Sequence, residues 1–377
     1  MPYNAGTNRK AKYFNQYLKY YFNRYISNYN AYVWDNTITT GTNVISSNGT
    51  SKDALITAAI VEYEAYIASW NFTRHASNPL IQSPTTPTNA EAYPPVVFYE
   101  GVGDYKMLIK TDVNRTWKYT SADGVSWGSN AVGEWDYTLA TPLVLRKEGS
   151  TYYAFYGGFN TTPTGKIGYA TSTDFTTWTK YASNPIYQVS SYNAATGDDK
   201  QNIYLNDIIK ISENLYYFFG YASYEDFSNC TLIWGTGTSL TDVNFTHIID
   251  TPADLVYSEV WLQNAQVFKH PTTGKWMMTC TLGTQSTTTA DVQCQVAFYS
   301  ERTDVPEDFV FIPAPIFTVN ASNAWETRQV YASFWLKDES GNLITLGGDY
   351  AMYYSGHGTT ASAYHGVVCL ATITTIP

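Results

Sequence analysis

The sequence predicts an all-β chain, a five-bladed β-propeller, preceded by an N-terminal α-helical hairpin. Three observations carry this prediction. A unit of short strands recurs five times, its fifth copy stops after the third strand, and a segment ahead of the first copy repeats the fourth strand of the second copy. Four-stranded units repeated in series are typical of propeller blades.

The clearest copy spans Gly133–Tyr187. Its strands are expected at Thr141–Lys147, Thr151–Gly157, Lys166–Ser172 and Thr177–Tyr181, because these apolar and aromatic runs are separated by turn residues. A single sheet of this size cannot bury both of its faces. Further copies are therefore needed on either side.

The other copies appear when the turns and the aromatic second strands are aligned. The second strands then read YKMLIK, YYAFYG, YYFFGY, KWMMTC and LITLGG. The third strands match best, with WKYTSADG in the first copy and IGYATSTD in the second. In this alignment the inner strands begin near Pro95, Pro142, Asn206, Ala265 and Ala332.

The ring is expected to close through the strand near residues 70–81. Phe72–Leu80 repeats Trp178–Ile186, with Ala-Ser-Asn-Pro and an aliphatic residue at the same offset. Added to the incomplete last blade, this strand would remove an open sheet edge. The alternative is an open run of hairpins with a chance match.

Residues 1–69 are predicted to form a separate segment ahead of the propeller, which spans 70–377. Apolar and tyrosine residues at helical spacing predict helices over Arg9–Tyr32 and Lys52–Ser69, and Ser51 can cap the second. Tyrosines cover more than one side of this hairpin. It is therefore expected either to brace one face of the propeller or to bind a partner subunit or larger particle.

Composition bounds the partners. The formal net charge of -10 disfavours nucleic acid, while 34 Tyr and 11 Trp beside only 14% charged residues suit contacts with sugars or proteins. No run is long and apolar enough to span a bilayer, and Met1 is not followed by a recognisable signal peptide.

The four cysteines lack metal-ligand spacing, so no metal or other cofactor is predicted. Cys280 and Cys294 fall on neighbouring predicted strands and could pair, but buried free thiols are the favoured interpretation.

The blades resemble a known family. The features that carry the resemblance follow one another along a blade: paired aromatic residues followed by Tyr and Gly, then IGYATSTD with a nearby Trp, then NPI or NPL. In addition, Trp135-Asp136 precedes a Pro-containing strand. This pattern, over about residues 70–377, is similar to the five-bladed propellers of the arabinanase, invertase and levansucrase type among glycoside hydrolases and to related mannoside phosphorylases. The resemblance implies carboxylates at the starts of the inner strands, facing the central funnel, which act as proton donor and as base or nucleophile.

The implied catalytic pattern is largely missing. At the position just after Pro142, where the family often has Asp, the five blades have Val96, Leu143, Asp207, Gln266 and Ser333. Where the family places a Glu in the fourth blade, this chain reads Gln263-Asn264-Ala265-Gln266, and a carboxamide cannot transfer a proton usefully.

Displaced acids remain ahead of the inner strands: Glu91, Asp136, Glu259 and Glu326. An alternative catalytic site would combine Asp207 with Glu259 or Glu326; otherwise such acids merely accept hydrogen bonds at strand entries. Flat aromatic faces beside polar groups bind sugars, so the predicted substrate-binding residues are Glu91, Asp136, Trp261, Gln263, Trp325 and Tyr331.

The predicted function is a glycan-recognising or structural propeller on a glycosidase-like scaffold. Its N-terminal helices would bind a protein partner in a larger assembly such as a phage or viral particle. The alternative is an active glycoside hydrolase or glycan phosphorylase acting on an extracellular polysaccharide. The expected partners are a carbohydrate and a protein, and no nucleic acid or membrane partner is expected. Homo-oligomer formation is left open. The expected location is a virion or an extracellular surface.

Overall fold

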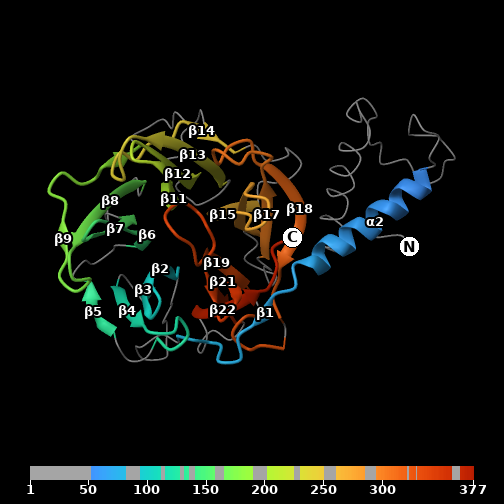
Figure 1. Ribbon diagram of the computed structural model, residues 1–377, viewed down its shortest axis with the longest axis horizontal. Helices are drawn as coiled ribbons and strands as arrows, with labels where there is room; N and C mark the ends of the chain where they lie inside the picture. The colour runs from blue at the N-terminus through green and yellow to red at the C-terminus, as the bar shows by residue number, and fades with distance from the viewer. Residues whose placement is uncertain are drawn as a thin grey trace.

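The five predicted blades are present and form a ring (Figure 1). The computed structural model describes the following ranges: 52–81, 94–111, 115–127, 131–135, 141–157, 165–189, 202–224, 230–249, 260–284, 294–320, 322–327, 329–358 and 366–377. The expected helix over 9–32 lies outside these residues. The second helix is confirmed as α2 (Lys52–Ser69), which extends outward from the ring beside β18.

Blade 1 contains β2 (Val96–Gly101), β3 (Asp104–Thr111), β4 (Arg115–Ser121) and β5 (Ala131–Trp135). Blade 2 contains β6 (Thr141–Glu148), β7 (Thr151–Gly157) and β8 (Lys166–Ser172), with β9 (Thr179–Lys180) and β10 (Tyr187–Gln188) both paired to β8. Blade 3 contains β11 (Asn202–Ser212), β12 (Leu215–Ser223), β13 (Thr231–Gly237) and β14 (His247–Ile248). Blade 4 contains β15 (Val260–Lys269), β16 (Trp276–Thr284), β17 (Cys294–Tyr299) and β18 (Val310–Phe317).

Blade 5 joins the two ends of the described chain. Its order is β19 (Gln329–Trp335), β21 (Asp349–His357), β22 (Val367–Ile373) and β1 (Thr73–Arg74), with the short β20 (Thr345–Leu346) paired to β21. Thr73 pairs with Thr372, and Ile81 bridges to Val368. The predicted closure of the ring by the strand near 70–81 is therefore confirmed.

One strand assignment in blade 5 was wrong. The segment LITLGG was expected to be the second strand, but that strand is β21, which begins at Asp349. Two successive turns explain the error: one carries Gly341 and the next Gly347-Gly348, all with positive φ. The first turn closes a short extension, in which Ile344 donates to the Leu336 carbonyl, and the second is the true hairpin turn.

The repeated Asn-Pro motif has the same structural role in both places. The Asn78 side chain accepts from the Leu370 amide and donates to the Leu370 carbonyl, each at 2.8 Å. Asn184 makes the same two bonds to Tyr169 in blade 2, at 3.1 and 2.8 Å. Each asparagine thus fastens the outer segment of a blade to its third strand, which explains why the motif marks the closing strand.

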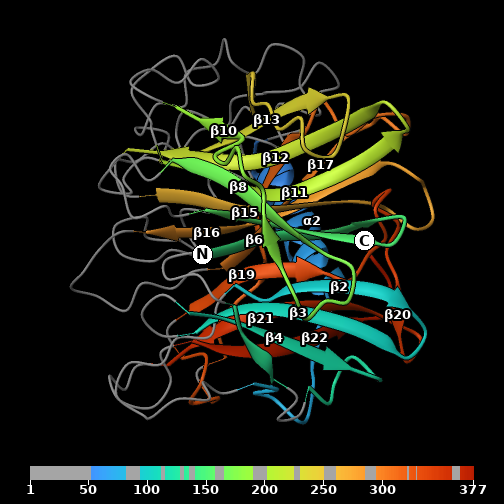
Figure 2. The same cartoon turned by 90° about the vertical axis from the view of Figure 1, so that its left-hand side faces the viewer.

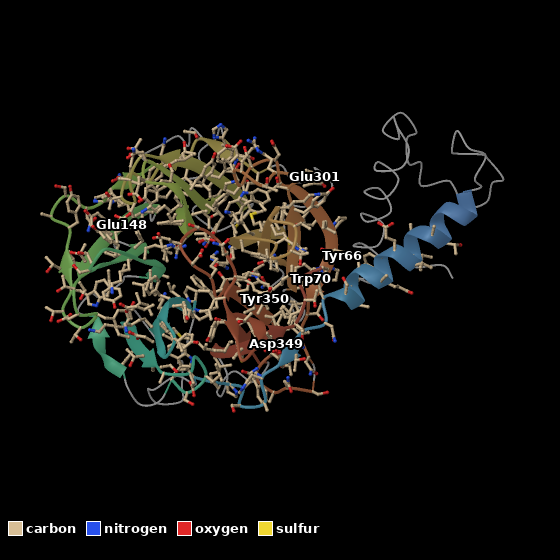
Figure 3. All side chains as sticks on the ribbon, viewed as in Figure 1. Tyr66, Trp70, Glu148, Glu301, Asp349 and Tyr350 are labelled. Carbon is tan, nitrogen blue, oxygen red and sulfur yellow. The ribbon has the colours of Figure 1, made fainter. Side chains whose placement is uncertain are left out.

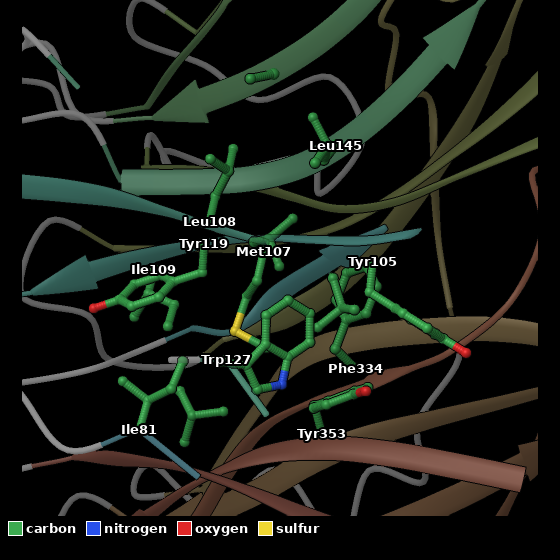
Figure 4. Close-up of a cluster of buried hydrophobic side chains, with 14 of the residues drawn as sticks. Ile81, Tyr105, Met107, Leu108, Ile109, Tyr119, Trp127, Leu145, Phe334 and Tyr353 are labelled. Atoms are coloured by element: carbon green, nitrogen blue, oxygen red, sulfur yellow. The ribbon is translucent and has the colours of Figure 1, made fainter. Parts of the chain in front are cut away.

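Apolar clusters fill the spaces between adjacent blades. One cluster joins blades 1, 2 and 5 around Met107 and Trp127, which are almost fully buried (Figure 4). Three others join blades 2 and 3, blades 3 and 4, and blades 4 and 5. All four cysteines are free and buried within this core. No helix among the described residues meets the length and apolarity required to cross a membrane.

Helix α2 meets the ring at its C-terminal end. Tyr66 and Trp70 lie where the helix approaches blade 4 (Figure 3). Trp70 is 4% exposed and stacks on Phe72, which packs edge-on against Phe317 of β18. The helix is thereby anchored beside the closing strand.

Candidate functional site: a cavity at the start of the inner strands

The inner strands of the blades run along the ring axis and begin on the same face (Figure 2). A cavity of about 300 Å³ opens where these strands start. Its lining includes tyrosines (Tyr204, Tyr221, Tyr331), carboxamides (Asn206, Gln263, Asn264, Gln266), Ser333 and Lys110. None of the described lining residues is a carboxylate.

Bulges in the inner strands shape this cavity. In β6, β11, β15 and β19 the register with the second strand shifts by one residue at the same level of the ring. The extra residue falls at Leu143 in blade 2 and at Asn206 in blade 3. A bulge bends the strand and redirects side chains, as at many binding sites.

The bulges in blades 4 and 5 use an unusual backbone conformation. Asn264 has φ 58° and Ala332 has φ 49°, both in the left-handed region. The Ala332 amide donates to the Thr281 hydroxyl of blade 4 at 3.1 Å, so the neighbouring blade holds this bulge in place. In blade 3, a Cβ added to Gly220 of the second strand would lie 2.3 Å from the Tyr204 carbonyl, so glycine permits the close approach of β12 to the bulged strand.

The bulges also change which residue faces the funnel. The sequence alignment equated Asn206 with Pro142, whereas the strand pairing equates Asn206 with Leu143, the next residue. Because side chains alternate along a strand, a one-residue shift moves a side chain to the other face. Asn206 therefore lines the cavity and Asp207 points below it.

Asp207 is 0% exposed and joins four blades. One carboxylate oxygen accepts from Arg146 of blade 2 at 2.7 Å, and the other accepts from the Val267 amide of blade 4 at 2.7 Å and from Lys337 of blade 5. We call Asp207, Arg146 and Lys337 the central triad. Burial lowers the pKa of Lys337 to about 8, although the Asp207 carboxylate opposes this shift.

The central triad contacts a residue that lines the cavity, Gln266. Lys337 also donates to the Val267 carbonyl at 2.7 Å and lies 3.4 Å from the Oε1 atom of Gln266. Gln266 in turn donates to the Asn206 carbonyl at 2.7 Å and lines the cavity. Gln266 therefore connects the lining of the cavity to the buried ion pairs.

Glu326 lies at the boundary between blades 4 and 5 and is 0% exposed. Its carboxylate accepts from Asn323 and Tyr354, each at 2.8 Å, and pairs with Arg74 of the closing strand at 2.5 Å. Arg74 also stacks over the ring of Phe317 in β18. The predicted acid Glu326, in the segment between β18 and β19, thus links the closing strand to Tyr354 of β21 within blade 5.

The remaining predicted site residues fall into three groups. Gln263 and Tyr331 are brought together at the cavity, where the Tyr331 hydroxyl donates to Oε1 of Gln263 at 2.9 Å. Trp325 packs against the cluster between blades 4 and 5. Glu91, Asp136 and Glu259 lie outside the described residues, and Trp261 lies in β15 with a side chain that is also outside them.

Sequence reasoning missed several residues of the site. Tyr204 and Tyr221 stack at 4.9 Å between ring centroids and line the cavity beside Asn206 and Asn264. A useful signal was available for Arg146 and Lys337, since each is a cation at the end of an apolar inner strand. Their convergence on Asp207 requires the ring itself. Among the described residues, no three His, Cys, Asp or Glu side chains are placed to hold a metal ion.

Comparison with known proteins places the fold. No protein-family model matches the sequence, and no curated protein matches it significantly. A thermostable family-43 glycoside hydrolase superposes with a TM-score of 0.53 at 12% identity, over 77% of this chain and 91% of that one. A GH62 hydrolase solved in complex with xylotriose gives 0.52 at 14% identity, over 82% and 99% of the two chains. By its structure, the chain shares the five-bladed β-propeller fold of these glycoside hydrolases.

Proposed function

We propose that the protein recognises a glycan in the cavity at the start of the inner strands. The observation that carries this proposal is the lining, which combines tyrosine rings with buried carboxamides and no described carboxylate. Rings bind the apolar face of a sugar, while carboxamides both donate to and accept from its hydroxyls.

Binding is the role best supported by the chemistry of the described acids. A glycosidase needs two carboxyl groups beside the scissile bond, one of them free to give and take a proton. Asp207 and Glu326 are each fully buried and paired with cations. A hydrolase on this scaffold would therefore draw its acids from Glu91, Asp136 and Glu259, and that alternative is tested by analysing reaction products.

The first experiment is a glycan array with the full-length protein, followed by isothermal titration with each hit. Because the structurally similar GH62 hydrolase was solved with xylotriose, pentose oligosaccharides are included. We expect a hit whose affinity falls about tenfold or more in Tyr331→Ala. The control is Tyr181→Ala, which removes a 43% exposed ring from the outer part of blade 2 and should leave binding unchanged. An array without hits, or equal losses in both variants, would contradict the proposal.

A second part of the proposal concerns attachment to a protein partner through the N-terminal segment. Helix α2 extends away from the ring and contacts β18; Ala59 and Tyr63 are buried, while Val61 on the same helix is 63% exposed (Figure 1). Such a projecting helix suits a role as a connector to another subunit. The larger assembly predicted from composition, a phage or viral particle, stays a prediction. Deleting residues 1–69 should abolish assembly in sedimentation velocity and leave a cooperatively folded propeller; a truncated chain that still assembles would refute it.

A further inference from the structure

Two buried polar atoms at the cavity have no hydrogen-bond partner among the described residues. They are Oδ1 of Asn206, in a residue only 7% exposed, and Nδ2 of Asn264. Both residues sit on bulges in adjacent blades, and both line the cavity. A buried polar atom left without a partner destabilises the folded state, so such atoms call for an explanation.

Neighbouring polar groups at the cavity are used within the protein. Gln263 bonds to Tyr331 and to the Cys230 sulfur, and the Ser333 hydroxyl donates to Gln295 at 2.6 Å. Gln266 is held by the Asn206 carbonyl and the central triad. Asn206 and Asn264 are therefore distinguished because each lines the cavity and carries one buried polar atom, an acceptor in Asn206 and a donor in Asn264, without a partner among the described residues.

Resting on the proposed function, we propose that Asn206 and Asn264 together determine specificity by binding two adjacent free hydroxyls of a neutral sugar. One hydroxyl donates to Oδ1 of Asn206, and the oxygen of its neighbour accepts from Nδ2 of Asn264. Hydroxyls can fill both roles because each is a donor and an acceptor. A carboxylate or sulfate has no proton to donate to Asn206, so a uronic acid or sulfated sugar presenting its anionic group at this pair is disfavoured.

The backbone holds the pair ready before a ligand arrives. The Asn206 carbonyl is fixed by Gln266 of blade 4, the same strand that carries Asn264. Asn264 is held at φ 58° in the bulge. Asparagine tolerates this conformation better than most residues, so a purely conformational role for Asn264 must be separated from binding.

Asn264→Gly separates the two roles. Glycine adopts positive φ freely, so the bulge is preserved while the carboxamide is lost. If Asn264 binds a hydroxyl, Asn264→Gly and Asn264→Ala should weaken binding equally, while the glycine variant keeps the higher Tm because alanine strains the backbone. Asn206→Ala removes the acceptor on the other strand. The control is Asn342→Ala, in an exposed turn of blade 5 that does not line the cavity.

The experiment measures Kd and unliganded Tm for the full-length protein and these variants. The probes are xylotriose, arabinotriose, trigalacturonic acid and the array hits. We expect neutral sugars to bind, with Kd about tenfold higher in Asn206→Ala and in Asn264→Gly, unchanged affinity in Asn342→Ala, and no loss of Tm in Asn206→Ala. Each of two adjacent hydroxyls of the sugar is also methylated in turn. When the hydroxyl that bonds to one asparagine is methylated, substitution of that asparagine should no longer change Kd.

Four outcomes overturn the inference. If Asn206→Ala and Asn264→Gly bind a sugar as tightly as the wild-type protein does, the role of the pair is refuted but glycan recognition stands. The same conclusion follows if the wild-type protein prefers trigalacturonic acid to the neutral sugars. A clear fall in Tm of unliganded Asn206→Ala assigns that residue to folding. Absence of any glycan binding by the wild-type protein overturns the proposed function and this inference with it.

Discussion

The carboxylate of Asp207 offers a direct test of what holds the ring together, because its partners come from blades 2, 4 and 5 while Asp207 itself belongs to blade 3. Asp207→Asn keeps the shape of the side chain and removes its charge. Arg146 and Lys337 are then left as buried cations without a counter-ion, since they are 6% and 8% exposed. Breaking a buried ion pair by removing one partner costs about 3–5 kcal/mol of unfolding free energy.

This loss converts into a measurable change in Tm. Unfolding entropy of about 2.1 cal/mol/K per residue amounts to about 0.8 kcal/mol/K for this chain of 377 residues. Asp207→Asn should therefore lower Tm by about 4–6 °C. Lys337→Met should cost less, about 1–2 kcal/mol, because Asp207 keeps Arg146 and its backbone donors. The double variant should be more stable than the sum of the two losses predicts, because the neutralised site then carries one fewer unpaired cation.

Differential scanning calorimetry and urea unfolding of the four proteins provide the measurement. The reasoning is refuted if Asp207→Asn unfolds at the wild-type Tm, or if Lys337→Met is the more damaging of the two single substitutions. An Asp207→Asn protein of unchanged stability that loses a glycosidase activity would instead assign the residue to catalysis.

Three further predictions concern the closing strand and pH. Arg74→Met should lower the unfolding free energy by about 3–5 kcal/mol and speed amide exchange in β22, because it leaves the buried Glu326 carboxylate without its cation. Combining Arg74→Met with Glu326→Gln should restore part of the lost stability. Normal protection of the β22 amides in the single variant would contradict this. Asn78→Ala and Asn184→Ala should each cost about 1–3 kcal/mol in urea unfolding, because each removes the same two bonds to a third strand; a cost confined to Asn184→Ala would argue that the closing strand contributes little. The pKa of Lys337 is about 8 in the folded protein and 10.5 in the unfolded chain, so the unfolded chain binds more protons between these pH values. The unfolding free energy of the wild-type protein should therefore rise from pH 8 to pH 10 relative to that of Lys337→Met. A difference between the two proteins that stays constant over this range would exclude the lowered pKa of Lys337.

The blades were predictable because local chemistry repeats with them. In blade 2 the Ser172 hydroxyl donates to the Asp174 carboxylate, which also accepts from the backbone amides of Thr176 and Thr177. The Trp178 ring nitrogen donates to the Phe175 carbonyl. The same arrangement of bonds recurs in blade 1, ending at Trp127. Residues that build a turn by contacts within a few positions leave a readable spacing in the sequence, so the copies could be aligned.

The funnel could not be read in the same way. Inner strands are buried on both faces, so apolar and polar residues do not alternate through a bulge and nothing in the pattern marks the extra residue. Alignment by turns therefore put Asp207 in the lining position that Asn206 occupies. The partners of Asp207 lie 61 and 130 positions away, and only the closed ring brings them together.

Charged and uncharged polar groups thus have different tasks at the centre of this propeller. The Asp207 carboxylate accepts hydrogen bonds from two cations and from backbone amides, so its lone pairs are occupied within the protein. The central acid is therefore suited to holding four blades in register. The uncharged groups that line the cavity can be left without protein partners at a smaller cost, because an unpaired carboxamide is far less destabilising than an unpaired charge. Gln266 connects the two tasks, since it contacts Lys337 on one side and holds the Asn206 carbonyl on the other, so loosening the central triad should also disturb the cavity.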